Sequence, residues 1–118
     1  MIYSAPVDWT AVYSIGAPSS VNKTYTYQVY TYGNGYDISC TYISGNYDRN
    51  VLVQKKYLKN ETDYINPITV ANVHAETIPN GLIYVPNTTD NYGNFITFMF
   101  TAQSSYNLTA NGVISYHN

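Results

Sequence analysis

Alternation of apolar and polar residues is the dominant pattern along this chain. Within residues 36–43 every second side chain is apolar or aromatic, and polar side chains fill most positions between them. This period of two is typical of a strand with one buried face. Residues 25–32 form another run, rich in tyrosine and β-branched residues. Because Gly33-Asn34-Gly35 separates the runs, we predict that they pair as an antiparallel hairpin around an Asn-Gly turn.

Further turn signals divide the rest of the chain into short segments. Asn111-Gly112 stands between residues 105–109 and 113–116, which predicts a second hairpin. Pro79-Asn80-Gly81 predicts a turn that leads into another strand. Ser44-Gly45-Asn46 predicts the end of the strand that precedes it.

Two segments indicate where strands lie within a sheet. Residues 95–101 are the most apolar stretch and carry aromatic residues on both faces, so we predict a central strand covered on both sides. Residues 50–60 are compatible with a helix or with a lysine-bearing edge strand, and we favour the edge strand. Seven of the twelve charged residues lie between positions 48 and 63. We therefore expect this region to be the best solvated part, on an edge or an excursion.

These patterns predict one all-β domain that spans residues 1–118. A chain of 118 residues fits one compact domain, because a second would be too small to form its own core. About six to nine short strands with frequent turns favour an antiparallel β-sandwich or a barrel-like domain with Asn-Gly hairpins.

Composition narrows the classes of function. Charged residues make up 10% of the chain, against about 25% in an average soluble domain. The net charge of -2 disfavours general nucleic-acid binding. No apolar run approaches the roughly 20 residues that a membrane helix needs, so we expect no membrane insertion. With Cys40 as the single cysteine, no intramolecular disulfide framework or cysteine-built zinc site can form.

Candidate catalytic and metal-binding residues are few. His74-Ala75-Glu76 resembles half of the zinc deaminase motif, but the half that contains two cysteines is missing. Cys40 alternates onto an apolar face, which predicts a buried structural role. His117 is next to the last residue, so we expect it to be frayed. Residues 87–94 are rich in oxygen ligands but hold one carboxylate, which favours a plain loop. We predict no enzyme, no cofactor and no metal.

Tyrosine is the most informative residue type, because seven of the fifteen tyrosines lie between positions 25 and 47. Along residues 25–32 they occupy both faces, and one core cannot bury both rows. The outer row either reinforces the sheet through cross-strand pairs or forms a contact surface. Our candidate contact residues are Tyr27, Tyr30, Tyr32, Tyr36 and Tyr47.

The N-terminal residues 1–8 lack the basic and apolar regions of a secretory signal. The composition of the chain, rich in Tyr, Asn and Thr, is nevertheless typical of proteins on an external surface. We expect either an excised domain or a protein that leaves its cell as part of a virion. Four Asn-x-Thr sequences are possible glycosylation sites: Asn22, Asn60, Asn87 and Asn107.

In composition the chain resembles structural and attachment proteins of viruses and phages. This resemblance implies a non-enzymatic protein of the virion or extracellular surface that binds a receptor by contact. The alternatives are an extracellular glycan- or protein-binding module of a larger chain, and a surface filament subunit. We expect a homo-oligomer, in which copies of the chain bind one another or other virion proteins. A host-surface glycan or protein is the candidate ligand.

Overall fold

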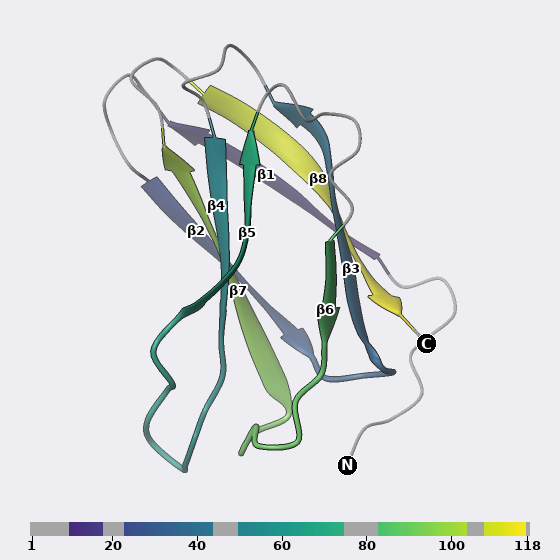
Figure 1. The fold of residues 1–118 in the computed structure, drawn as a ribbon, viewed down its shortest axis with the longest axis vertical. Coiled ribbons are helices and arrows are strands. Elements are labelled where there is room, and N and C mark those ends of the chain that lie inside the picture. Colours follow the sequence, from purple (N-terminus) through teal and green to yellow (C-terminus); the bar gives the residue numbers. More distant parts are fainter. Residues whose placement is uncertain (1–9, 18–22, 44–49, 75–82, 104–107, 118) are drawn as a thin grey trace.

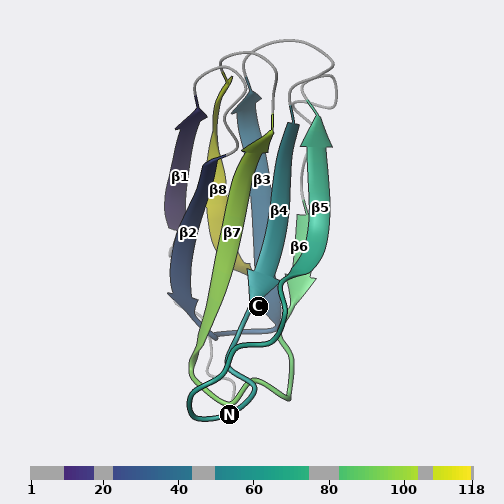
Figure 2. The same ribbon diagram turned by 90° about the vertical axis from the view of Figure 1, so that its left-hand side faces the viewer.

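In this computed structural model, the described residues (10–17, 23–43, 50–74, 83–103 and 108–117) form eight strands and no helix. The strands build two antiparallel four-stranded sheets that stack as two layers (Figures 1 and 2). The first sheet has the order β1-β8-β3-β6 and the second has the order β2-β7-β4-β5. The strands are β1 (Thr10–Ala17), β2 (Lys23–Tyr30), β3 (Gly35–Ile43), β4 (Asn50–Lys56), β5 (Ile68–His74), β6 (Ile83–Pro86), β7 (Phe95–Gln103) and β8 (Leu108–His117).

The pairing pattern is that of a long hairpin rolled into two layers. β1 pairs with β8, β2 with β7, β3 with β6 and β4 with β5. The β3–β8 and β4–β7 pairs then complete the two sheets. An eight-stranded double sheet with this order is a jelly roll. The all-β sandwich predicted from the alternation is confirmed.

The hairpin predicted around Asn34-Gly35 is wrong. β2 pairs with β7, whereas β3 pairs with β8 and β6 in the opposite sheet. In this segment φ is positive at Gly33 (59°) and at Gly35 (157°). The chain uses this turn to cross between the layers, so that Val29 of β2 and Tyr36 of β3 enter the same core from opposite sheets.

The hairpin predicted around Asn111-Gly112 is also wrong. β8 passes through this dipeptide without a turn, and Gly112 is paired with Tyr13 on one side and with Cys40 on the other. Opposite Asn111 and Gly112, the pairing register of β3 shifts between Cys40 and Tyr42, as in a β-bulge. Ladder hydrogen bonds to two neighbouring strands therefore override the local turn preference. Residues 105–107 and the turns predicted at 44–46 and 79–81 lie outside the described residues.

β7 is central, as predicted, because it lies between β2 and β4. Its inward row is fully buried and consists of Ile96, Phe98, Phe100 and Ala102. The expectation that both faces are covered is wrong for this chain, since a two-layer sandwich covers one face of each sheet. On the outer face Thr97 is buried, Met99 is half-buried and Phe95 is exposed.

Residues 50–56 form a strand, which decides against the helix, but this strand is not at an edge. β4 lies between β7 and β5, and the edge position belongs to β5. Lys55 is on the inward row and is buried, while Lys56 is half-buried. The solvent-exposed segment predicted for this region is found in the connection that follows β4, where residues 59–63 are all exposed.

The core lies between the two sheets and is dominated by aromatic and β-branched residues. Tyr36 of β3 and Phe98 of β7 are both fully buried, and their rings meet edge to face at 5.1 Å across the sandwich. Each buried side chain of this size contributes about 1.5–3 kcal/mol through removal of apolar surface from water. Cys40 is buried in the same cluster, which confirms its predicted placement.

Candidate functional site

The three described connections between strands lie at one end of the sandwich, which we call the loop end (lower end in Figures 1 and 2). They comprise residues 31–34 after β2, 57–67 after β4 and 87–94 after β6. These segments are far apart in sequence. Only the rolled topology brings them together.

The 87–94 loop is anchored on one side to the segment that follows β4. The Tyr57 hydroxyl lies 3.1 and 3.0 Å from the two carboxylate oxygens of Asp90. The backbone N–H of Tyr92 donates to the carbonyl oxygen of Leu58 at 2.8 Å. Within the loop, the side-chain oxygen of Asn91 accepts from the N–H of Gly93, and its amide nitrogen donates to the carbonyl oxygen of Phe95.

Electrostatics reinforce the Tyr57–Asp90 anchor. The hydrogen bond from Tyr57 is the main cause that lowers the pKa of Asp90, and Thr88 and the positive charge of Lys55 act in the same direction. Burial, followed by the hydrogen bond to Asp90, raises the pKa of Tyr57. The pair is therefore held as a neutral phenol and an ionised carboxylate at neutral pH.

On its other side the loop is anchored to the crossing segment between β2 and β3. The N–H and the hydroxyl of Thr31 both donate to the carbonyl oxygen of Asn94, at 2.9 and 3.2 Å. The side-chain nitrogen of Asn87 donates to the carbonyl oxygens of Tyr32 and Gly33, both at 3.0 Å. A glycan attached to this nitrogen would disrupt both hydrogen bonds, so the fold disfavours glycosylation of Asn87.

Between these anchors the loop end forms a partly open pocket of about 400 Å³. None of the described residues that line it is charged, and Tyr92 has 60% of its surface exposed. The lining residues are Thr31, Thr88, Thr89, Asn91, Tyr92, Gly93 and Asn94.

Next to the pocket, a series of ring contacts leads from the surface into the core. Tyr30 and Phe95 are exposed, and their ring centroids are 4.4 Å apart. The series continues from Tyr30 to Tyr32 at 5.8 Å, from Tyr32 to Tyr116 at 5.3 Å, from Tyr116 to Tyr36 at 5.5 Å and from Tyr36 to Phe98 at 5.1 Å. Burial raises the pKa of Tyr116 to about 12 and also raises the pKa of Tyr36.

The candidate contact tyrosines from the sequence occupy different surroundings. Tyr30 and Tyr32 lie together at the loop end. Tyr27 is half-buried on the inward side of β2, edge to face with Phe100 at 5.6 Å. Tyr36 is fully buried, which excludes direct surface contact, and its hydroxyl donates to the carbonyl oxygen of Tyr30 at 2.7 Å. Tyr47 lies outside the described residues.

Sequence reasoning missed the exposed rings of Phe95 and Tyr92. Because residues 95–101 were predicted to be a strand covered on both faces, Phe95 was expected to be buried. Because residues 87–94 were interpreted as a plain loop, Tyr92 was given no role. The available signal was an aromatic residue inside a loop rich in Thr and Asn.

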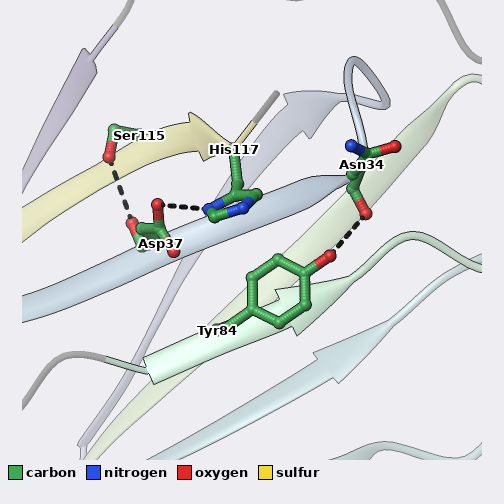
Figure 3. Close-up of polar contacts among 5 residues, drawn as sticks. All are labelled: Asn34, Asp37, Tyr84, Ser115 and His117. Atoms are coloured by element: carbon green, nitrogen blue, oxygen red, sulfur yellow. Dashed lines mark hydrogen bonds and ion pairs between the residues drawn. The ribbon is translucent and has the colours of Figure 1, made fainter.

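The expectation that His117 is frayed is wrong. It belongs to β8, and its carbonyl oxygen accepts from the N–H of Asn34 at 2.8 Å. Its Nδ1 lies 2.9 Å from Oδ2 of Asp37, and its ring packs 4.7 Å from that of Tyr84 (Figure 3). The β3–β8 register creates this contact, so the local sequence carried no signal for it.

Ser115, His117 and Asp37 are the residue types of a hydrolase triad, but their arrangement differs from one. The Ser115 hydroxyl donates to the backbone carbonyl oxygen of Asp37 at 3.4 Å (Figure 3). A triad requires the serine to bond to the histidine, which in turn bonds to the carboxylate. The contacts here join β3, β6 and β8 at the outer face of the first sheet.

The described part of the chain contains no cluster of three or more His, Cys, Asp or Glu side chains placed to hold a metal ion. Nor do these residues include a helix long and apolar enough to cross a membrane. Comparison with known proteins found no matching family, no similar curated protein and no similar solved structure.

Proposed function

We propose that the protein is a non-enzymatic structural or attachment protein of a virus or phage particle, located on the virion or extracellular surface. The observation that carries the proposal is the exposure of Tyr30, Phe95 and Tyr92 at one end of an eight-stranded jelly roll. Jelly rolls are the architecture of viral capsid and lectin domains, which supports the proposal by analogy of fold. Exposed aromatic rings provide large contact area at low entropic cost.

We propose in addition that a second copy of the chain covers the Tyr30–Phe95 pair. Both rings project from the outer face of the second sheet, with 50% and 37% of their surfaces exposed. Aromatic residues are enriched, and charged residues depleted, in the centres of interfaces between identical subunits. A net charge of only -2 gives little repulsion between copies.

Light scattering at micromolar concentration tests the self-association. We expect a closed oligomer that dissociates when Tyr30→Ser and Phe95→Ser are combined. The matched control is Tyr84→Ser, which removes a ring of similar exposure (49%) from the first sheet. A monomer of 13.3 kDa for the unaltered chain would overturn this proposal.

Labelling of particles tests the proposed location. An antibody raised against the chain should decorate particles purified from the source culture by density gradient. Its target should also be enriched with them in proportion to particle number. Recovery of the chain only as part of a larger, non-particulate surface protein would contradict a virion role. That result would favour the alternative of an extracellular glycan- or protein-binding module, and open-ended polymers would favour a filament subunit.

A further inference from the structure

The pocket at the loop end has the chemistry of a site for an uncharged, hydroxyl-rich ligand. Its lining offers threonine hydroxyls and asparagine amides, which both donate and accept hydrogen bonds. The described residues that line it include no lysine or arginine for an anion and no carboxylate for a cation. Its volume of about 400 Å³ lies within the range of small-molecule sites.

Several of the lining side chains keep their polar atoms available. Within the described residues, the side-chain polar atoms of Thr89, Tyr92 and Asn94 take part in no hydrogen bond. Asn91 differs, because its amide oxygen and nitrogen are both used to hold the loop. The described lining therefore contains positions whose side chains hold the loop and positions whose polar atoms have no partner among the described residues.

Among the described lining residues, Tyr92 is the one with a large apolar surface. The ring is 60% exposed, while the backbone N–H of the same residue is fixed to Leu58. A sugar ring presents C–H groups on one face and hydroxyls at its edge, so it can stack on a tyrosine and bond to neighbouring polar groups at once. A wholly apolar ligand would leave the threonine and asparagine groups without partners.

Hydrogen bonds anchor the 87–94 loop on both of its sides. Bonds to Tyr57 and Leu58 hold one side of the 87–94 loop, and bonds to Thr31 hold the other. The nearest acidic group in the loop, Asp90, is engaged by Tyr57 and does not belong to the lining. Such preorganisation lowers the entropic cost of binding.

We propose that this pocket binds one neutral sugar residue of a surface glycan. Tyr92 stacks on the apolar face of the sugar, and Thr89 and Asn94 bond to its hydroxyls. This inference rests on the proposed attachment function and specifies its ligand class.

An array of neutral and sialylated oligosaccharides, probed with the unaltered chain, provides the first measurement. Saturation-transfer NMR with the methyl glycosides of glucose, galactose, mannose and N-acetylglucosamine at millimolar concentration provides the second. We expect binding to neutral glycans, with transfer to at least one methyl glycoside. No binding in either assay, or binding confined to sialylated glycans, would overturn the inference.

Variants locate the binding. Tyr92→Ala should weaken affinity about tenfold or more, because it removes the stacking surface. Tyr64→Ala is the matched control, since it removes a tyrosine with 43% exposure from the same end but outside the pocket lining. We expect the control to bind within about twofold of the unaltered chain. Equal affinity of the Tyr92→Ala variant, with an unchanged melting temperature, would place the sugar elsewhere and overturn the assignment.

The two proposals fail separately. Absence of sugar binding from a chain that antibodies detect on particles would remove the sugar site and leave the virion role. Sugar binding by a chain that is absent from particles would keep the pocket assignment and contradict the virion role.

Discussion

The aromatic rings inside the sandwich and those at its loop end are the same kinds of side chain in opposite surroundings. Tyr36 and Phe98 have no exposed surface and join the two sheets. Tyr30, Phe95 and Tyr92 expose between 37% and 60% of theirs. Tyr32 and Tyr116 connect the two groups through ring contacts. The interior rings therefore stabilise the fold, whereas the loop-end rings keep their apolar surface available for a partner.

The largest expected effect comes from removal of an interior ring. Phe98→Ala should lower the free energy of unfolding by about 3–5 kcal/mol, since it leaves a cavity between the sheets. Tyr92→Ala at the loop end should change it by about 0.5 kcal/mol or less. Urea denaturation of both variants measures the difference. Equal losses would show that the loop-end ring is a structural element.

Gly35, at the junction of the two regions, should tolerate substitution poorly. An added Cβ would overlap the carbonyl oxygen of Val85 and lie 2.9 Å from Cα of Pro86. Gly35→Ala should therefore lower the free energy of unfolding by about 1–3 kcal/mol. Asn34→Ala, one residue earlier and exposed, is the control and should have a smaller effect in thermal denaturation. A neutral Gly35→Ala would mean that β3 and β6 separate easily.

The hydroxyl groups of the tyrosines sharpen the comparison further. Tyr36→Phe removes a 2.7 Å hydrogen bond to the carbonyl oxygen of Tyr30 in a buried position, so we expect a loss of about 1–2 kcal/mol. Tyr84→Phe removes an exposed bond of 3.1 Å to the carbonyl oxygen of Asn34. Its loss should be about 0.5 kcal/mol, since water replaces the bond. Identical losses in urea denaturation would contradict the difference in burial.

High pH should lower stability through Tyr116, one of the rings that connect the two groups. The pKa of Tyr116 is about 12 in the folded state against about 10 in the unfolded state, so its contribution to stability is complete below pH 10. Between pH 10 and 12 the unfolded chain loses this proton while the folded chain keeps it, and stability falls as pH rises. Tyr116→Phe should reduce that slope in denaturation series at pH 9, 10 and 11. An unchanged slope would contradict the effect of burial.

The smallest expected effect concerns the contact between Asp37 and His117. Both side chains are partly exposed, and exposed ion pairs contribute little. Asp37→Asn should change the free energy of unfolding by about 0.5 kcal/mol or less at neutral pH. A loss above about 2 kcal/mol would show that this contact, rather than the interior rings, holds β8 to β3.

Local pattern was sufficient for the fold class and for the faces of single strands. The alternation over residues 36–40 predicted that Tyr36, Ile38 and Cys40 share a face, and these three are buried while the residues between them are half-buried. A strand's period depends on its own backbone geometry, so it can be read from consecutive residues.

Strand partners could not be predicted in the same way. Asn-Gly occurs at positions 34–35 and 111–112, yet the first crosses between sheets and the second lies inside β8. The turn preference of this dipeptide is worth less than ladder hydrogen bonds on both sides of a strand. Those bonds depend on residues as distant as Tyr13 and Cys40, which pair with Gly112.

The candidate site shows the same division. Sequence alone determined a weakly charged, tyrosine-rich β domain with more aromatic rings than one core can bury. The tertiary structure decided which rings those are. Tyr36 is buried because the chain crosses to the opposite sheet before it, and Tyr30 is exposed because it lies on the outer face of β2, opposite Phe95. Exposure depends on the element that packs against a residue, and in a jelly roll that element comes from the far end of the chain.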